Sequence, residues 1–196
     1  ADSLTGGAGN DSLTGGDGAD TISGGDGNDT ITAGDGLDSL TGGAGSDLFV
    51  FTAGSNSTGS SPDSITDFVS GTDTVRVSLS GDQNWDVSGF SAVTSFADGL
   101  VSLGLTKGDA FYSSNDSKLY VDVDGNGTIN QGNDYVVSMA SVAAGDLGFD
   151  ITGGGAANTI VGGAGADLLT GGAGADTFVL TTLTTTDSVM DFTAGA

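Results

Sequence analysis

Aspartates recur every nine residues at the start of the chain, and this spacing is the feature with the clearest chemical content. The series runs without a slip through Asp2, Asp11, Asp20, Asp29, Asp38 and Asp47. A second series lies near the end of the chain, at Asn158, Asp167 and Asp176. Carboxylates at short regular intervals are typical ligands of a hard cation such as Ca²⁺, which takes about six to eight oxygens.

The residues around each Asp repeat as well. Residues 6–50 read GGAGNDSLT, GGDGADTIS, GGDGNDTIT, AGDGLDSLT and GGAGSDLFV, and residues 153–179 read GGGAANTIV, GGAGADLLT and GGAGADTFV. The shared pattern is G-G-x-G-x-D-x-U-x, in which U is apolar. A fixed period of this kind predicts a solenoid built from one short structural unit.

Composition shows that so many carboxylates need a neutralising partner. The chain has 26 acidic residues, all Asp, and only three basic ones, so its formal net charge is −23. The chain has no His and no Cys, which excludes disulfides, a Cys/His zinc site and His-dependent catalysis. The acidic balance argues against nucleic-acid binding, and no apolar run approaches the roughly 20 residues of a membrane span. Because 36% of residues are hydrophobic and regularly placed, we expect a folded chain.

Each position of the repeat has a physical reason. Glycines at positions one, two and four allow φ > 0 and a close approach of the backbone to a ligand. Positions seven to nine predict a three-residue strand, with position eight pointing inward. Two nonapeptides then close one 18-residue coil, and coils stack about 4.8 Å apart. We predict an all-β fold, a parallel β-roll with an intervening antiparallel β cap or sandwich module. The predicted inward residues are Leu13, Ile22, Ile31, Leu40, Phe49, Ile160, Leu169 and Phe178.

Stacked coils bring Asp residues two repeats apart into register on the same edge. An ion held between turns by two carboxylates and several glycine-loop carbonyls would convert their repulsion into attraction. The predicted pairs are Asp2/Asp20, Asp11/Asp29, Asp20/Asp38 and Asp29/Asp47, with Gly6, Ala8, Gly15 and Gly24 as candidate backbone ligands. Position three adds Asp17, Asp26 and Asp35 to the negative field, and whether they also bind the ion stays open. In the second block Asn158 pairs with Asp176 and Asp167 with Thr185, so we expect fewer or weaker ions there.

These nonapeptides resemble the RTX family, calcium-binding repeats of bacterial proteins exported by type I secretion. The resemblance implies a parallel β-roll, several Ca²⁺ ions between the turns, and export of an unfolded chain that folds on meeting calcium outside the cell. The stretches PDSITDF and GTDTVRVSL resemble the segment that caps the roll in that family, and KLYVDVDGNG resembles its C-terminal module. We therefore divide the chain into a first roll (1–50), a cap or sandwich module (51–150), a second roll (151–180) and the start of a second cap (181–196).

Two further groups of polar residues lie in the predicted cap. One group could bind a cation, although turn and surface Asp are the favoured interpretation: Asp63, Asp67 and Asp73. The other fits the start of an EF-hand loop, but its flanks read as β, so a hairpin turn is favoured over a cation site: Asp122, Asp124 and Asn126.

The end of the chain repeats an earlier stretch. Aligning Asp176 on Asp47 gives a second, much longer period, and Asp187 and Asp191 then fall on Asp63 and Asp67 across a shorter loop. The sequence therefore reads as a window on a longer, tandemly repeated protein.

The favoured function is structural. We expect a calcium-stabilised module of a large secreted bacterial protein, in a surface layer, adhesin or filament, with Ca²⁺ and further copies of itself as partners and no catalytic activity. The alternative is the secretion and folding module of a secreted enzyme or toxin whose catalytic domain lies outside this chain. A glycan- or ice-binding module is disfavoured, because Ser and Thr are ordinary residues on a solvated strand face.

Overall fold

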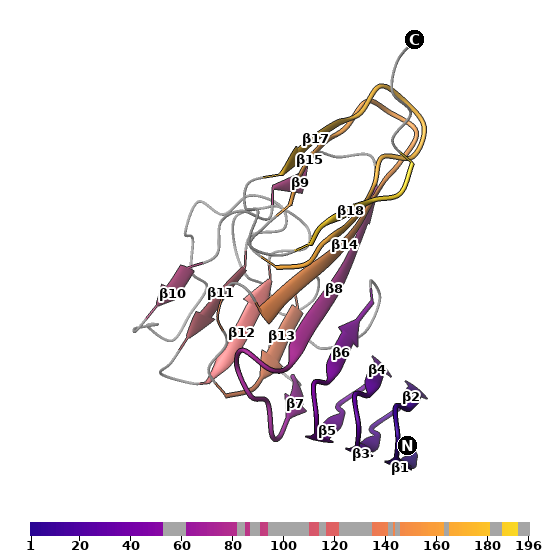
Figure 1. Ribbon diagram of the computed structural model, residues 1–196, viewed down its shortest axis with the longest axis vertical. Helices are drawn as coiled ribbons and strands as arrows, with labels where there is room; N and C mark the ends of the chain where they lie inside the picture. Colours follow the sequence, from indigo (N-terminus) through magenta and orange to yellow (C-terminus); the bar gives the residue numbers. More distant parts are fainter. Residues whose placement is uncertain are drawn as a thin grey trace.

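The computed structural model describes residues 1–52, 62–81, 85–86, 91–93, 110–113, 117–121, 135–140, 143, 146–162, 165–180 and 186–191. These residues form strands and contain no α-helix, so the all-β prediction is confirmed for them (Figure 1). The strands are β1 (Ser3–Ala8), β2 (Ser12–Asp17), β3 (Thr21–Asp26), β4 (Thr30–Asp35), β5 (Ser39–Ala44), β6 (Leu48–Phe51), β7 (Asp63–Ile65), β8 (Thr74–Gly81), β9 (Trp85–Asp86), β10 (Ser91–Val93), β11 (Ala110–Ser113), β12 (Lys118–Val121), β13 (Tyr135–Ser138), β14 (Leu147–Gly153), β15 (Thr159–Gly162), β16 (Leu168–Thr170), β17 (Thr177–Leu180) and β18 (Ser188–Val189).

The first roll is a parallel β-roll with the predicted register. Strands β1, β3 and β5 form one face and β2, β4 and β6 the other, and every neighbouring pair is parallel. Leu4 lies beside Ile22, its counterpart two repeats later, which confirms the predicted coil length. The strands β1 to β5 span six residues each, so the three-residue prediction was too short. The ladder continues because the glycine positions also pair, as Gly7 does with Gly25.

Glycine has two different roles in each repeat. Positions two and four have positive φ, for example 119° at Gly25 and 134° at Gly27, which favours glycine. Position one does not, so the prediction of φ > 0 there was wrong. A Cβ atom at Gly6 would lie 2.5 Å from Asp11 Oδ2 and 2.6 Å from the carbonyl oxygen of Gly24. A carboxylate and a neighbouring coil therefore occupy the space of a side chain at Gly6, and the fourth repeat has only the small, fully buried Ala33 at position one.

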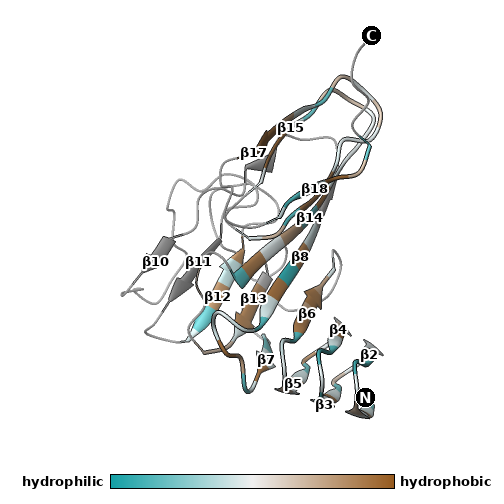
Figure 2. Cartoon of the chain, viewed as in Figure 1, coloured by the Kyte–Doolittle hydropathy of each residue, from teal (hydrophilic) through white to brown (hydrophobic). Residues whose placement is uncertain are grey.

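The core is a stripe of position-eight side chains enclosed between the two faces. The fully buried members from the first roll are Ile22, Ile31, Leu40 and Phe49, and Leu4 and Leu13 pack against them partly buried. The stripe continues through Phe51, Val75 and Phe149. Phe68 packs against Phe49, with 6.2 Å between the centroids of the two rings. Figure 2 shows the resulting apolar character of β6. Position eight therefore has the predicted inward orientation.

One parallel sheet runs from the first roll into the second. Its strand order is β2-β4-β6-β8-β14-β16-β18, and it crosses the segment limits that the sequence suggests at residues 50, 150 and 180. Strand β8 pairs in parallel with β6 on one side and β14 on the other. Val75 and Val77 stand in register with Phe49 and Phe51, so β8 extends the same buried stripe.

The segment predicted as an antiparallel cap contains both antiparallel and parallel strand pairs. Strands β11, β12 and β13 are antiparallel neighbours, which confirms the predicted hairpin between β12 and β13. However, β7 pairs in parallel with both β5 and β13, because it stacks on the roll as a further coil. The side chains predicted for the hairpin turn, Asp122, Asp124 and Asn126, lie outside the described residues.

The second roll lies at the far end of the long strands β8 and β14 (Figure 1). Its faces are β14-β16-β18 and a three-stranded parallel sheet, β17-β15-β9. Leu169 and Ile160 fill its interior and are fully buried. In the part of the chain that the structure describes, no helix has the length and apolar character needed to span a membrane.

Candidate calcium centre

The position-six aspartates form two hydrogen-bonded ladders along the edges of the first roll. Each carboxylate accepts the backbone N–H of the Asp one coil earlier. The four bonds run from Asp2 N to Asp20 Oδ1 (2.5 Å), Asp11 N to Asp29 Oδ1 (2.8 Å), Asp20 N to Asp38 Oδ1 (2.8 Å) and Asp29 N to Asp47 Oδ1 (2.9 Å). All four predicted pairs are therefore brought together. One oxygen of each carboxylate holds the side chain in place, which leaves the other for a ligand.

The second carboxylate oxygens are buried without a donor. Asp11, Asp20, Asp29 and Asp38 each have an Oδ2 atom that is shielded from solvent and accepts no hydrogen bond. A buried ionised oxygen in this state is strongly unfavourable unless a cation compensates it. Burial accordingly raises the pKa of Asp38 above its ordinary value, with the charge of Asp20 adding to the effect. Burial likewise raises the pKa of Asp47.

At position one, a backbone carbonyl oxygen and a carboxylate oxygen border the same small space. The space of a Cβ atom at Gly15 is bordered by Asp20 Oδ2, at 2.7 Å, and by the carbonyl oxygen of Ala33. Gly6 has the same surroundings one repeat earlier, and Gly24 one repeat later. Within the described ranges no group of three or more acidic side chains converges. An ion here would complete its shell with carbonyl oxygens, as Ca²⁺ readily does. The residues present therefore fit calcium.

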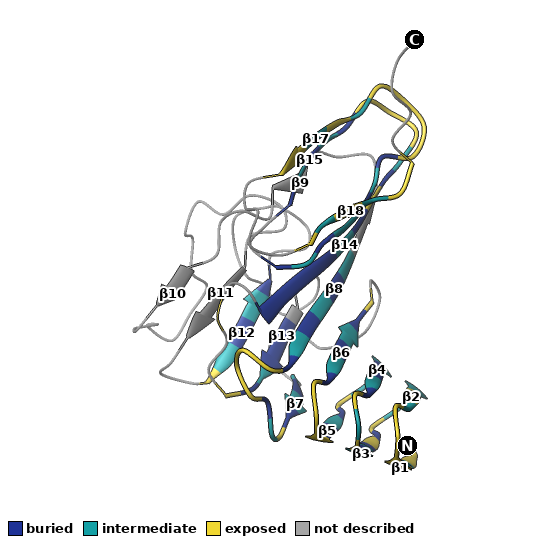
Figure 3. Ribbon diagram, viewed as in Figure 1, coloured by how far each residue is buried: buried dark blue, intermediate teal, exposed yellow. Residues whose placement is uncertain are grey.

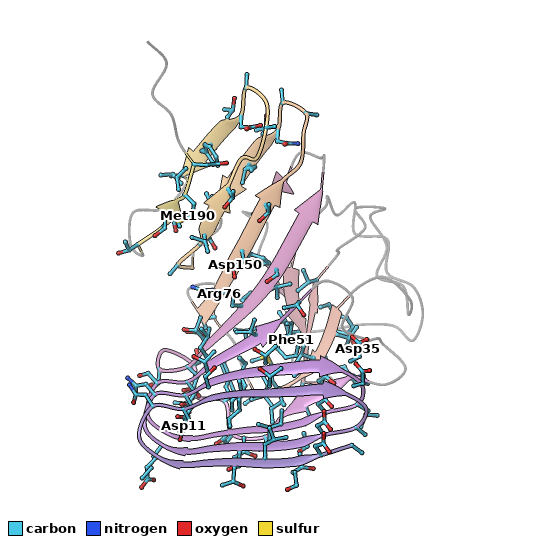
Figure 4. All side chains as sticks on the ribbon, turned by 90° about the vertical axis from the view of Figure 1, so that its right-hand side faces the viewer. Asp11, Asp35, Phe51, Arg76, Asp150 and Met190 are labelled. Atoms are coloured by element: carbon cyan, nitrogen blue, oxygen red, sulfur yellow. The ribbon has the colours of Figure 1, made fainter. Side chains whose placement is uncertain are left out.

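The position-three residues lie apart from these ladders. Asp17, Asp26 and Asp35 are exposed, as is Ala8 at the same position of the first repeat. Asp17 and Asp35 are register partners in the parallel pairing of β2 with β4. Asp35 projects at the edge opposite Asp11 (Figure 4). These acids add negative charge to the outside of the roll.

Asp63 and Asp73 extend the ladders, although the sequence favoured turn or surface positions for them. Asp63 Oδ1 accepts the N–H of Asp38 at 2.8 Å, and Asp73 Oδ1 accepts that of Asp47 at 3.1 Å. They are 0% and 5% exposed, so the surface interpretation was wrong. The available signal was the motif itself, because both precede a Ser or Thr and then an apolar residue. Asp73 Oδ2 also accepts the N–H of Val69, so hydrogen bonds engage both of its oxygens.

Asp67 caps the backbone of a preceding coil. Its two oxygens accept the N–H groups of Gly42 (2.9 Å) and Gly43 (2.8 Å). Asp191 binds Gly171 (2.8 Å) and Gly172 (2.7 Å) in the same way. These two N–H groups lower the pKa of Asp191 below its usual value. The motif D-S-U-x-D therefore supplies one ladder carboxylate and one capping carboxylate.

The second roll repeats the first in the way that the longer period predicts. The alignment of Asp176 on Asp47 places Asp167 on Asp38, and the N–H of Asp167 donates to Asp187 Oδ1 (3.2 Å) as that of Asp38 does to Asp63. The predicted pairing of Asp167 with Thr185 was wrong, because this coil is longer than the regular one by two residues. Thr185 itself lies outside the described residues.

The neutral member of the second roll keeps its place in the ladder. Asn158 donates its N–H to Asp176 Oδ1 at 2.9 Å, as predicted from the spacing of two repeats. Its side-chain oxygen lies 2.6 Å from where a Cβ of Gly153 would be, so it occupies the carboxylate position. Asp187, which the longer period aligns with Asp63, supplies the acid that pairs with Asp167, and Asn158 still leaves its own site with one charge fewer.

Two further acids stabilise the junction between the rolls. Asp146 accepts hydrogen bonds from the N–H of Gly71 and the hydroxyl of Ser70, which ties the loop before β8 to the start of β14. Arg76 Nε on β8 lies 3.5 Å from Asp150 Oδ1 on β14, and both residues are labelled in Figure 4. Burial raises the pKa of Asp150 and the Arg76 charge lowers it, with burial the larger effect. Asp146 is therefore engaged by protein donors and Asp150 is paired with the Arg76 charge, which leaves the ladders as the candidate calcium ligands.

Comparison with known proteins agrees with this geometry. The family model of the RTX calcium-binding nonapeptide repeat matches four copies, over residues 1–31, 23–57 and 145–180. These ranges contain both rolls. The chain therefore carries RTX calcium-binding repeats, and its cofactor is Ca²⁺ at several sites.

The comparison with solved structures gives a weaker likeness. One match is the solution structure of the AlgE6R3 subunit from the Azotobacter vinelandii mannuronan C5-epimerase, at 24% identity. The match covers 68% of this chain and 72% of that one, with a TM-score of 0.25. A superposition this poor carries no argument about fold or activity. Curated protein sequences give no significant match.

Proposed function

We propose that this chain is a calcium-stabilised structural module of a large secreted bacterial protein, part of a surface layer, an adhesin or an extracellular filament. One observation carries the proposal. The ladders bury carboxylate oxygens that accept no hydrogen bond, and these carboxylates stack from coil to coil along both edges of the roll. Calcium would bind coil to coil, and the same ions would determine when the chain folds.

The charge of the chain supports folding outside the cell. A net charge of −23 opposes the compact state, and the ladders concentrate that charge inside the roll. Glycine, at 37 residues, also loses more backbone entropy on folding than other residues. Binding free energy of the ions would offset both costs. Extracellular calcium modules commonly bind in the range of about 10⁻⁴–10⁻³ M, which separates the exterior from a calcium-poor cytoplasm.

The module itself would have no catalytic role. The chain has neither His nor Cys to act as a base or nucleophile, and Asp146 at the junction already accepts hydrogen bonds from Ser70 and Gly71. Self-association at the cell surface would be its biological activity.

Calcium titration followed by circular dichroism tests the proposal. In excess chelator the chain should be largely disordered, and millimolar Ca²⁺ should produce a β-rich spectrum. Mg²⁺ should be a poor substitute, because it requires tighter octahedral geometry. A β-rich spectrum in chelator, or equal folding by both ions, would contradict a calcium-stabilised module.

A further inference from the structure

Three turns of the first roll contain an Asp that is followed directly by Gly. The pairs are Asp17–Gly18, Asp26–Gly27 and Asp35–Gly36, at positions three and four of the repeat. The three aspartates are exposed and lie apart from the carboxylate ladders. Figure 3 shows exposed segments at the turns between the strands of this roll. An aspartate isomerises most readily before glycine, because glycine has no side chain to hinder attack by its own backbone nitrogen.

The isomerisation needs only water and a backbone nitrogen that is free to move. At Asp26 the nitrogen of Gly27 attacks Cγ of the protonated carboxyl group, and the proton on nitrogen leaves with the carboxyl OH as water. The product is a five-membered succinimide ring. Water then breaks the bond between this nitrogen and the α-carbonyl carbon, which leaves the chain linked through Cγ as isoaspartate. The atomic composition is unchanged, but the backbone has gained one methylene group and a free α-carboxylate.

The neighbouring coils hold the attacking nitrogens in place. Gly27 N donates to the carbonyl oxygen of Ala44 at 2.8 Å, and Gly18 N donates to that of Asp35 at 2.6 Å. A Cβ atom at Gly27 would lie 2.3 Å from the carbonyl oxygen of Gly9, so the preceding coil packs against the same turn from its other side. The nitrogen therefore reaches Cγ only when the turn opens locally.

Isomerisation would destroy the contacts that Asp26 makes with the coils on either side. Asp26 stands in register with Ala8 on one side and Ala44 on the other. Its carbonyl oxygen accepts the N–H of Gly9 at 2.7 Å, and this carbonyl group becomes the free carboxylate. The added methylene also lengthens a repeat whose pairing depends on a constant length. A chain with isoaspartate at this position would not restore the coil when calcium returns.

We infer that Asp17 and Asp26 are sites of spontaneous isoaspartate formation, and that the stacking of calcium-bound coils protects them. The inference rests on the proposed function, because calcium is what keeps the coils stacked. In the folded roll the glycine nitrogens stay bonded and the turns stay intact. In a chain that remains without calcium the same nitrogens are released, and isomerisation then removes the ability to fold. The chemistry of the chain therefore limits how long it can stay unfolded.

Isoaspartate mapping of the full chain tests the inference, with circular dichroism on the same samples. The chain is kept at neutral pH for several weeks in millimolar Ca²⁺ or in chelator, and is then digested. Enzymatic methylation and mass spectrometry locate the isoaspartate. In chelator it should accumulate at Asp17 and Asp26. In Ca²⁺ it should accumulate at least about tenfold more slowly, because attack then requires local opening of a stacked turn.

Replacing the three aspartates by alanine gives a matched control. The variant has three substitutions: Asp17→Ala, Asp26→Ala and Asp35→Ala. Alanine already occupies position three at Ala8 and Ala44, so the variant should fold with calcium. After storage in chelator, added Ca²⁺ should restore a larger fraction of the initial β signal in the variant than in the native chain. Asp98–Gly99 and Asp124–Gly125 lie outside the described residues and are common to both chains, so the difference reports on the first roll.

Each alternative result has a defined meaning. Equal isoaspartate formation at Asp26 in the calcium-folded and the chelated chain would overturn the inference and leave the proposed function standing. A disordered chelated chain without isoaspartate at Asp26, or equal recovery of the variant and the native chain, would do the same. A chain that is β-rich in chelator would overturn the proposed function, and slow isomerisation there would still support protection by stacking. A chain that stays disordered in Ca²⁺ would overturn both.

Discussion

Replacing Asp29 by Asn isolates the role of charge in the ladder. Asp29 is 1% exposed, its Oδ1 accepts the N–H of Asp11 at 2.8 Å, and its own N–H donates to Asp47 Oδ1 at 2.9 Å. Asparagine keeps the size and the accepting oxygen, and removes the charge and the second carboxylate oxygen. The second roll already contains this arrangement at Asn158. The substitution should therefore leave the backbone register unchanged.

The effect on stability should change sign with calcium. Carboxylates one strand spacing apart, about 4.8 Å, repel by about 3.5 kcal/mol per neighbour at an effective dielectric constant of roughly 20. Salt screens this repulsion little, because Asp29 and Asp47 are buried. Without calcium, Asp29→Asn should thus stabilise compact states. With calcium it removes a charged ligand, so the folded state should lose stability.

The calcium midpoint measured by circular dichroism reports this difference. We expect Asp29→Asn to raise the midpoint at least tenfold, equivalent to about 1.4 kcal/mol. Asp26→Asn is the control, because it makes the same change of charge at a nearby exposed position. Its midpoint should change less than about twofold. Equal shifts for the two variants would show that total charge, and not the buried ladder, determines calcium binding.

Three other predictions follow from the structure. Burial raises the folded-state pKa of Asp38 and Asp47, so protonation favours the fold and stability is lost as pH rises through those pKa values. In chelator, the β signal in circular dichroism should therefore be larger at pH 4 than at pH 7.5. Asp67→Ala removes two charge-assisted bonds to backbone N–H groups, and should cost about 2–4 kcal/mol of calcium-bound stability in urea titrations. Gly7→Ala should cost about 1–2 kcal/mol through strain at φ 112° alone. Gly25→Ala should cost roughly 2 kcal/mol more in the same titrations, because its Cβ would also clash with the Gly7 carbonyl.

The outcomes that contradict these predictions are equally specific. A chelated chain that loses β signal on acidification would show that the buried carboxylates do not oppose folding. Unchanged urea stability of Asp67→Ala would mean that water replaces the carboxylate cap without cost. Equal losses for Gly7→Ala and Gly25→Ala would show that φ alone, and not contact between coils, requires glycine.

The sequence predicts the regular part of the structure well, because each coil depends only on its neighbours. The register of the coils, the inward position eight and the paired carboxylates of Asp11 and Asp29 all follow from a constant period. The length of the strands was harder to predict. The strands continue through Gly7 and Gly25 because the backbones pair there, and the side-chain pattern does not reveal this pairing.

Departures from the period could not be predicted in the same way. Asp63, Asp73 and Asp187 join their ladders after 25, 26 and 20 residues, so counting in steps of nine misses them. Their recognition requires the distance that each loop spans in space. Local sequence pattern also does not predict the pairing of β8 with β14, because residues 82–146, most of the predicted cap, separate these two neighbouring strands in the sequence.

The direction of the Asp-to-backbone bonds gives the roll a polarity with consequences for truncation. Each coil has its N–H group satisfied by a carboxylate of the coil that follows, as Asp20 N is by Asp38. Strand pairing is lost when a coil is removed at either end, as for the Thr21 N–H that donates to the Asp2 carbonyl. Among the Asp-to-backbone bonds, however, removing the first coil frees only a carboxylate oxygen, which water can solvate. Removing a later coil instead leaves a buried N–H without an acceptor, at about 1–3 kcal/mol. Shortening the roll from its beginning should be tolerated far better than shortening it from its end.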